Sequence, residues 1–166
     1  MRVDIVRATD AERAVIQNLG RLYVYDLSEF AGWPCPNDGL YECCDLSSYW
    51  GPDGMAFVIR ADGELAGFAL VDQRHDRGTS EPHYWMGEFF VLRKFRRQGI
   101  GREAASTILD LLPGAWEIAQ VPKNRPAIAF WRSIAGRHTS GAFTESERWF
   151  EHTGERLNVL AFRTVS

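Results

Sequence analysis

The stretch that most constrains the fold is residues 84–110, YWMGEFFVLRKFRRQGIGREAASTILD. Residues 84–92 are aromatic and apolar, as in a buried strand, and from residue 101 onward Ala, Ile and Leu recur at helical spacing. Residues 93–102 between them hold five Lys or Arg and no acid. A strand that turns into a helix N-terminus presents unpaired N–H groups and the positive end of the helix dipole. The stretch therefore predicts a strand, an anion-binding turn and a helix.

The glycines of this turn follow the pattern Arg96-x-x-Gly99-x-Gly101. Because glycine has no Cβ, the backbone of the turn and a phosphate group can approach each other closely. Two other phosphate-binding patterns are absent from the sequence. A P-loop requires a Gly-Lys pair, and the dinucleotide fingerprint requires three glycines in the order G-x-G-x-x-G.

A second pattern follows at Asn124, Ala127, Phe130 and Trp131. Together the two patterns resemble motif A (Q/R-x-x-G-x-G/A) and the N-x-x-A-x-x-F-Y helix of the GNAT superfamily of N-acetyltransferases. Residues 87–131 are matched by motif, and the flanking segments are matched only by the order of their elements. A basic turn whose charges are merely solvated is the alternative interpretation.

The rest of the chain supplies the remaining elements of such a fold. They are a strand over residues 2–7, a helix from 9 or 10 to about 26, a short helix within 40–49, a hairpin of 55–60 and 64–74, a strand over 115–121, a helix from about 124 to 136, and a hairpin of 143–151 and 158–164. The order βα(α)ββ–βαβα–ββ predicts an α/β (α+β) protein with a mixed, mostly antiparallel sheet of about 6–7 strands flanked by about four helices. This is the order of the GNAT fold.

Length and charge exclude several classes of protein. We expect residues 1–166 to form one domain, because the length suits a single core. A net charge of −3 argues against a nucleic-acid binder. No apolar run reaches about 18 residues, so no membrane partner is expected, and the charged N-terminus is unlike a secretory signal. We therefore expect a cytoplasmic protein, either a monomer or a homodimer.

The three cysteines Cys35, Cys43 and Cys44 cannot all pair with one another. Together with the four histidines they match no spacing that is typical of a metal site. We expect reduced thiols and no metal.

The resemblance implies that acetyl-CoA is the co-substrate. Backbone amides of residues 98–102 would hold its pyrophosphate, and a free strand edge at 89–91 would pair with the amides of its pantetheine arm. Gly87 marks a candidate bulge that frees this edge. The cofactor-binding residues implied are Phe89, Phe90, Val91, Arg96, Arg97, Gln98, Gly99, Ile100, Gly101, Arg102, Asn124, Phe130 and Trp131. The alternatives are core packing for the side chains of Phe89 and Phe90 and a helix-capping role for Asn124.

Acetylation of an amine requires a base, because an alkyl ammonium with a pKa near about 10.4 must first lose a proton. Glu88 is the first candidate, since it is the one charge in an apolar strand and desolvation would raise its pKa. Its alternatives are an ion pair with an arginine or a place at a strand end that is open to solvent. His83 is the second candidate base, and simple exposure is its alternative. Trp131 stands where the family has Tyr as general acid, and indole N–H is no practical acid.

Charge is divided unevenly along the chain, and this division predicts the acceptor. Residues 22–59 contain six acids and no Lys or Arg, and aromatic residues are interspersed among the acids. Carboxylates and aromatic faces suit an amine that arrives as a cation. The predicted acceptor-binding residues are Tyr25, Trp33, Asp38, Tyr41 and Glu42. A solvated acidic surface with core aromatics is the alternative.

The sequence thus predicts an N-acetyltransferase that moves an acetyl group from acetyl-CoA to a primary amine, a cationic small molecule, by direct attack. One alternative is a catalytically silent acyl-CoA-binding module, which the substitution of Trp131 for tyrosine favours. The others are acetylation of a protein amine and a non-enzymatic interaction domain.

Overall fold

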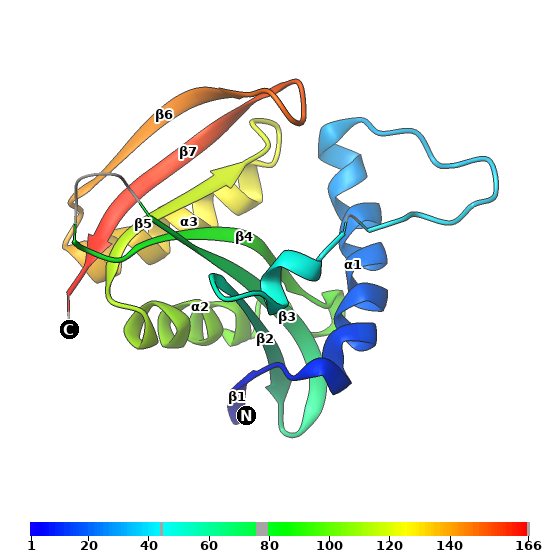
Figure 1. Ribbon diagram of the computed structural model, residues 1–166, viewed down its shortest axis with the longest axis horizontal. Coiled ribbons are helices and arrows are strands. Elements are labelled where there is room, and N and C mark those ends of the chain that lie inside the picture. Colours follow the sequence, from blue (N-terminus) through cyan, green and yellow to red (C-terminus); the bar gives the residue numbers. More distant parts are fainter. Residues whose placement is uncertain (44, 76–79, 166) are drawn as a thin grey trace.

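A computed structural model describes residues 1–43, 45–75 and 80–165. One seven-stranded sheet has helices on both of its faces (Figure 1). The strands are β1 (Val3–Arg7), β2 (Gly54–Ala61), β3 (Glu64–Arg74), β4 (His83–Val91), β5 (Gly114–Gln120), β6 (Phe143–Phe150) and β7 (Glu155–Thr164). The helices are α1 (Asp10–Ala31), α2 (Ile100–Leu111) and α3 (Arg125–Thr139), with 3₁₀ turns η1 (Ser47–Trp50) and η2 (Arg93–Phe95). The predicted mixed α/β class and element order are confirmed.

The sheet has the order β1-β2-β3-β4-β5-β7-β6, and only β4 and β5 are parallel. Pairing between β4 and β5 ends at Met86 and Ile118, although both strands continue. On the β3 side, the register shifts between Leu70 and Val71, which leaves Gly87 as an extra residue in β4. The predicted bulge at Gly87 is therefore present, and the second half of β4 has an edge that β5 does not cover.

Two layers of side chains hold the helices to the sheet. α2 and α3 pack on one face through a core that includes Ile108, Trp116 and Ile134. α1 and η1 pack on the other face through a core that includes Ile16, Phe68 and Phe90. Because β4 contributes to both cores, its residues can reach cavities on either side of the sheet.

α1 begins as predicted at Thr9, whose side chain and that of Glu12 form a reciprocal capping box. It extends five residues beyond the predicted end near residue 26, because no glycine or proline lies between residue 26 and Gly32. Gly32 closes the helix in the left-handed region with φ 76°. The additional residues matter for function, because Leu27, Glu29 and Phe30 line the cavity described below.

Three further expectations about helices require correction. The described part of the chain contains three α-helices rather than about four, since the described residues of the range 40–49 form only the start of η1. α3 continues past Gly136 to Thr139 and is capped by Ser140 in the left-handed region. A single glycine inside a helix costs only about 1 kcal/mol, so packing on the sheet overrides it. Cys44 and residues 76–79, part of the expected loop, lie outside the described residues.

Candidate active site

The basic turn has the conformation that its glycines predict. Gly99 is the N-cap of α2 with φ 86°, in the left-handed region that glycine adopts at little cost. Ile100 follows as a fully buried anchor, and the first N–H groups of α2 have no partner within the helix. A Cβ added at Gly101 would meet Phe130 and Val91 at 3.6 Å, an ordinary contact distance. The turn therefore offers an open helix N-terminus beside the end of β4.

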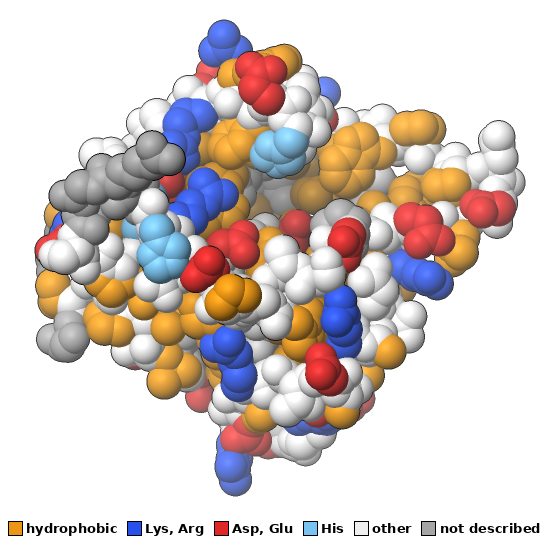
Figure 2. Space-filling model, in the orientation of Figure 1, with side chains coloured by type: hydrophobic (Ala, Val, Ile, Leu, Met, Phe, Trp, Pro, Cys, Tyr) orange, Lys and Arg blue, Asp and Glu red, His pale blue; other side chains and the backbone are white. Residues whose placement is uncertain are grey.

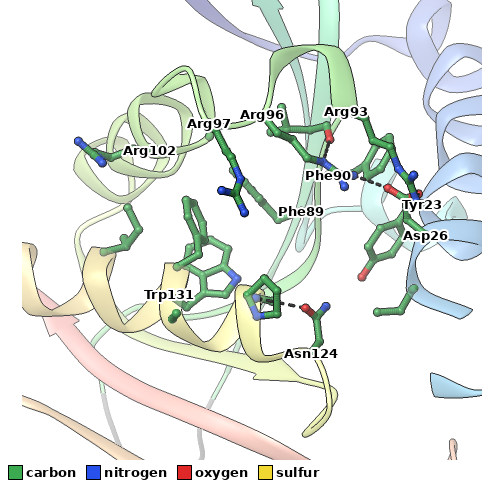
Figure 3. Close-up of a pocket in the computed structure, with 18 of the residues that line it drawn as sticks. Tyr23, Asp26, Phe89, Phe90, Arg93, Arg96, Arg97, Arg102, Asn124 and Trp131 are labelled. Carbon is green, nitrogen blue, oxygen red and sulfur yellow. Dashed lines mark hydrogen bonds and ion pairs between the residues drawn. The ribbon is translucent and has the colours of Figure 1, made fainter. Parts of the chain in front are cut away.

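A cavity of about 920 Å³ lies in front of this turn (Figure 3). We call it the arginine cavity, since Arg93, Arg96, Arg97 and Arg102 line it. The other lining residues are Tyr23, Asp26, Leu27, Glu29, Phe30, Phe89, Phe90, Val91, Gly99, Gly101, Asn124, Pro126, Ala127, Ala129, Phe130, Trp131, Ser133 and Ile134. Of the predicted cofactor-binding residues, only Gln98 and Ile100 have no place in this lining. The prediction invoked the backbone amides of these two residues rather than their side chains.

Three of the five bases in residues 93–102 are engaged by distant acids. Asp26 of α1 accepts hydrogen bonds from Arg93 at 2.8 and 3.0 Å and also binds Arg96. Hydrogen bonding to the Asp26 carboxylate raises the pKa of Arg93 above its usual value. Lys94 pairs in the same way with an acid of β3.

Arg97 and Arg102 have no acidic partner in the described part of the chain. The guanidinium of Arg97 points into the middle of the cavity in Figure 3. These two arginines therefore carry the positive charge that remains available to a ligand.

We expect Asp26→Asn to lower the melting temperature by a few degrees at low salt, because Asp26 holds α1 to the end of β4 through two arginines and is itself half-buried. The difference should shrink as salt rises, since salt screens partly exposed ion pairs. Glu64→Gln is the matched control. It removes a pair whose two side chains are both more than half exposed, so little change is expected. Thermal melts of the three proteins at two salt concentrations test this, and equal shifts in both variants would contradict it.

An aromatic wall separates α3 from β4. Phe89, Phe130 and Trp131 have ring centroids 4.9–5.8 Å apart. Trp131 is only 5% exposed, and Phe90 is buried on the opposite face of the sheet. Core packing thus accounts for the side chains of both phenylalanines of β4. Asn124 accepts a hydrogen bond from the N–H of Ala127 at 3.2 Å, so it also caps α3.

A second cavity, of about 380 Å³, lies on the other side of the β4–β5 divergence. We call it the carboxylate cavity, since Asp72, Glu88 and Glu155 line it. Arg74 also lines it, with its guanidinium 4.2 Å from the ring centroid of Trp85. Figure 2 shows a hollow between the β6–β7 hairpin and α1, with basic side chains on one margin and acidic side chains below.

The two cavities meet where β4 and β5 separate. The residues that line both are Tyr23, Leu27, Phe89, Asn124, Ala127 and Trp131. A ligand arm entering from the arginine cavity can therefore come close to a second ligand in the carboxylate cavity. Such an arrangement suits the direct transfer of a group between two bound molecules.

The two candidate bases lie in different surroundings. Glu88 is half-buried, follows the Gly87 bulge and lines the carboxylate cavity. His83 lies five residues earlier, about 16 Å along the strand at its usual rise. It contacts Glu117 at 3.1 Å, and Arg148 contacts the same carboxylate at 2.7 Å. His83 lines neither cavity, so the structure does not bring it to the junction.

Asp72 is a site residue that the sequence analysis did not single out. Burial raises its pKa above the ordinary value, although the positive charge of Arg74 and a hydrogen bond from Tyr49 partly oppose this shift. The Tyr49 hydroxyl lies over Gly87, where an added Cβ would come within 2.0 Å of the hydroxyl oxygen. Asp72 directly follows the apolar run of residues 65–71. An acid adjoining an apolar strand run is close to the signal that pointed to Glu88, so the sequence could have indicated it.

The predicted acceptor residues are only partly brought together. Trp33 lines the carboxylate cavity, whereas Tyr25, Asp38, Tyr41 and Glu42 line neither cavity. Tyr25 and Tyr41 pack on each other with ring centroids 5.6 Å apart. Asp38 accepts a hydrogen bond within its own loop, and Glu42 faces an arginine of α1 at 3.8 Å. In Figure 1 this loop projects away from the sheet. The acids of the carboxylate cavity come from strands instead.

Two further features bear on the class of site. Among the described residues, no group of three or more His, Cys, Asp or Glu is placed to hold a metal ion. Over the same ranges, none of the helices has the length and apolar character needed to span a bilayer.

The fold is shared with acetyltransferases of known structure. A GNAT-family acetyltransferase from Streptococcus agalactiae superposes with a TM-score of 0.71 at 15% identity, covering 99% of this chain and 96% of that one. The ribosomal-protein-S18-alanine N-acetyltransferase from Escherichia coli superposes with a TM-score of 0.60 at 16% identity, covering 99% of this chain and 96% of that one. An aminoglycoside acetyltransferase from an uncultured soil metagenomic sample superposes with a TM-score of 0.58 at 14% identity, covering 80% of this chain and 86% of that one.

No curated protein matches the chain in sequence. The model of the acetyltransferase (GNAT) family does match it, over residues 23–136. This range includes the basic turn, the start of α3 and the six residues that line both cavities. It covers more than half of the chain. The motifs, the divergence of β4 from β5 and the family match agree, and the chain belongs to the GNAT acetyltransferase family.

Proposed function

We propose that this protein, as a single domain over residues 1–166, transfers an acetyl group from acetyl-CoA to the primary amine of a small cationic acceptor. The observation that carries the proposal is the meeting of the two cavities at the β4–β5 divergence. Acetyl-CoA would enter from the arginine cavity and the amine from the carboxylate cavity. Direct transfer between them requires no covalent enzyme intermediate.

The arginine cavity fits the phosphates and the pantetheine arm of CoA. The amides at the start of α2 would hold the pyrophosphate, with Arg97 and Arg102 as the available charges. The backbone of residues 89–91, which β5 leaves uncovered, would pair with the pantetheine amides. In this proposal Arg93 and Arg96 remain paired with Asp26 when CoA binds, and they form part of the cavity wall.

The carboxylate cavity favours a cationic acceptor. Three carboxylates and one arginine line it, so the acidic side chains outnumber the arginine. Trp33 adds an aromatic face that a cation can contact. These strand carboxylates provide stronger support for the predicted cationic acceptor than the acids of the outer loop do. In this arrangement Asp72 binds the ammonium form of the acceptor.

Glu88 is the proposed base. Its carboxylate would accept a proton from the ammonium of the acceptor, and the neutral nitrogen would then attack the acetyl carbon. The thioester of acetyl-CoA supplies an activated acyl group. In this proposal the backbone beside the Gly87 bulge would donate a hydrogen bond to the thioester oxygen.

A silent acyl-CoA-binding module remains the second candidate function. It is favoured by Trp131 at the position of the family's acidic tyrosine. Release of CoA in the presence of an amine separates the two, because a silent module binds acetyl-CoA without releasing its thiol.

Turnover of acetyl-CoA with a panel of polyamines, aminoglycosides, amino acids and peptide N-termini tests the proposal. Cationic small amines should be preferred, and kcat/KM should fall as salt rises. An anionic or peptide acceptor as the best substrate would overturn the acceptor class and leave acetyl transfer intact. Absence of turnover with every amine, despite CoA binding, would favour the silent module.

We expect Asp72→Asn to raise KM for the best cationic amine about tenfold, with little change in acetyl-CoA affinity. Because burial raises the pKa of Asp72, its ionised form disfavours the folded state at pH values above that pKa. Below the ordinary value of 3.8 this penalty is absent. The variant should therefore melt at a higher temperature at neutral pH, which excludes misfolding as the cause. Asp53→Asn, an exposed acid outside both cavities, is the control.

A further inference from the structure

The reaction proposed above needs a proton for the sulfur of CoA as it leaves, and this inference rests on that proposed function. Trp131 cannot supply the proton, because indole N–H does not ionise in a useful range. A side chain that supplies the proton has to lie where the sulfur and the amine meet. That place is the junction of the arginine and carboxylate cavities.

Six described residues line both cavities, and their chemistry narrows the choice to one. Leu27, Phe89 and Ala127 are apolar, and Trp131 is excluded above. Asn124 has an amide that does not ionise, and its oxygen caps α3. Tyr23 is the remaining member of the six, and its hydroxyl can both donate and release a proton.

Packing directs Tyr23 toward the junction. Its ring lies against Phe90 and Phe68, with centroids 5.8 and 6.1 Å away. In Figure 3 the hydroxyl points into the cavity from α1, on the side opposite Trp131 and Asn124 of α3. The ring thus belongs to the core between α1 and the sheet, and only its polar end reaches the cavity.

The turn of α1 that carries Tyr23 is fixed in place. Asp26 lies three residues later, on the same side of the helix, and holds Arg93 and Arg96 just beyond the end of β4. These ion pairs join α1 to the basic turn that begins α2. The position of the Tyr23 hydroxyl is therefore coupled to the position of the proposed phosphate site.

We propose that Tyr23 is the general acid of the reaction, in the role that the tyrosine replaced by Trp131 would have had. As the carbon–sulfur bond breaks, its electron pair goes to sulfur and the proton of the Tyr23 hydroxyl forms the S–H bond of CoA. The phenolate then takes back a proton from solvent. The acceptor ammonium loses two protons as it becomes the amide. The first passes to Glu88 before attack and from there to solvent, and the second passes to solvent as the carbon–sulfur bond breaks, so one proton is released per turnover and atoms and charges balance.

The physical basis of this proposal is that the pKa of a phenol lies close to that of a thiol. A tyrosine has an ordinary pKa of about 10, so it holds its proton at neutral pH, and a thiol has a pKa of about 8.5. Hydrogen bonding to a thiolate lowers the pKa of the thiol. Tyr23 should therefore lower the pKa of the thiol of bound CoA, and this can be measured without turnover.

Tyr23→Phe removes one oxygen atom and keeps the ring in its packing site. We expect kcat to fall about 10²-fold, the lower end of the range for general acids, with KM values within about twofold. In an ultraviolet titration of CoA bound to the variant, the thiol pKa should rise by about one unit, a tenfold change in its ionisation constant. Tyr84→Phe is the control, since Tyr84 is a buried tyrosine of β4 that lines neither cavity, and it should change neither quantity.

The outcomes separate this inference from the proposed function. If the unmutated protein acetylates amines, and Tyr23→Phe retains its kcat and the unshifted thiol pKa, Tyr23 is not the acid. A loss of kcat with an unchanged thiol pKa would assign Tyr23 a structural role and would also overturn the inference. If the unmutated protein acetylates no amine but binds CoA with a lowered thiol pKa that rises in Tyr23→Phe, the proposed function fails while the contact between Tyr23 and the sulfur is supported. Failure of the unmutated protein to bind CoA overturns both.

Discussion

Glu88→Gln is expected to lower kcat by about 10²–10⁴-fold, the usual contribution of a general base. The substitution keeps the shape of the side chain and removes its ability to accept a proton. Glu88 lies beside the Gly87 bulge, on the stretch of β4 that β5 leaves uncovered, and it lines the carboxylate cavity. Acetyl-CoA affinity should be retained, and the acid-side limb of the pH profile of kcat/KM should disappear. Steady-state kinetics across pH and a CoA binding measurement test this.

The matched control for Glu88 is Glu117→Gln. Glu117 is also a half-buried carboxylate of the central sheet, but it pairs with His83 and Arg148 and lines neither cavity. Its kcat should remain within about threefold of the unmutated value. A normal pH profile in Glu88→Gln would show that a water chain or another residue accepts the proton. His83→Asn then measures whether His83 contributes from its distant position.

The second large effect concerns cofactor binding. CoA at 100 times its dissociation constant should stabilise the unmutated protein by about 2.7 kcal/mol, and Gly101→Val should abolish this gain. The Cβ of the valine fits at ordinary contact distance from Phe130 and Val91. Its two methyl groups extend further, into the space that a phosphate must approach. The ligand-free protein should therefore lose little stability, and thermal melts with and without CoA give both quantities.

Two other glycine variants sharpen the test. Gly101→Ala adds only the Cβ, so part of the CoA stabilisation should survive. Gly99→Ala places a side chain at φ 86° and should destabilise the protein by about 1–2 kcal/mol even without ligand. If CoA fails to raise the melting temperature of the unmutated protein, the assignment of the arginine cavity to CoA is wrong. If CoA still stabilises Gly101→Val, the phosphate does not bind at the start of α2.

Local features of the fold could be predicted because local sequence fixes them. Alternating and helical apolar patterns predicted every strand and the three α-helices, and Gly87, Gly99 and Gly101 marked the bulge and the turn. Thr9 and Asn124 marked helix starts, because a cap acts within three residues of itself. Helix ends were less well predicted, since packing on the sheet carried α1 and α3 past the positions expected to end them.

The sequence by itself determined that a strand, a basic glycine turn and a helix would form an anion site. Only the tertiary structure decided which charges remain available there. Asp26 reaches Arg93 and Arg96 across 67 and 70 residues of chain, and this leaves Arg97 and Arg102 without acidic partners.

The same reason applies to the acceptor side. Asp38 and Glu42 are close to Trp33 in sequence but lie in a loop that leaves the cavity. Asp72 and Glu88 are far from Trp33 in sequence and lie with it around one cavity. Charge pairing depends on distances of a few ångströms, and chain folding, rather than sequence spacing, sets those distances between remote segments.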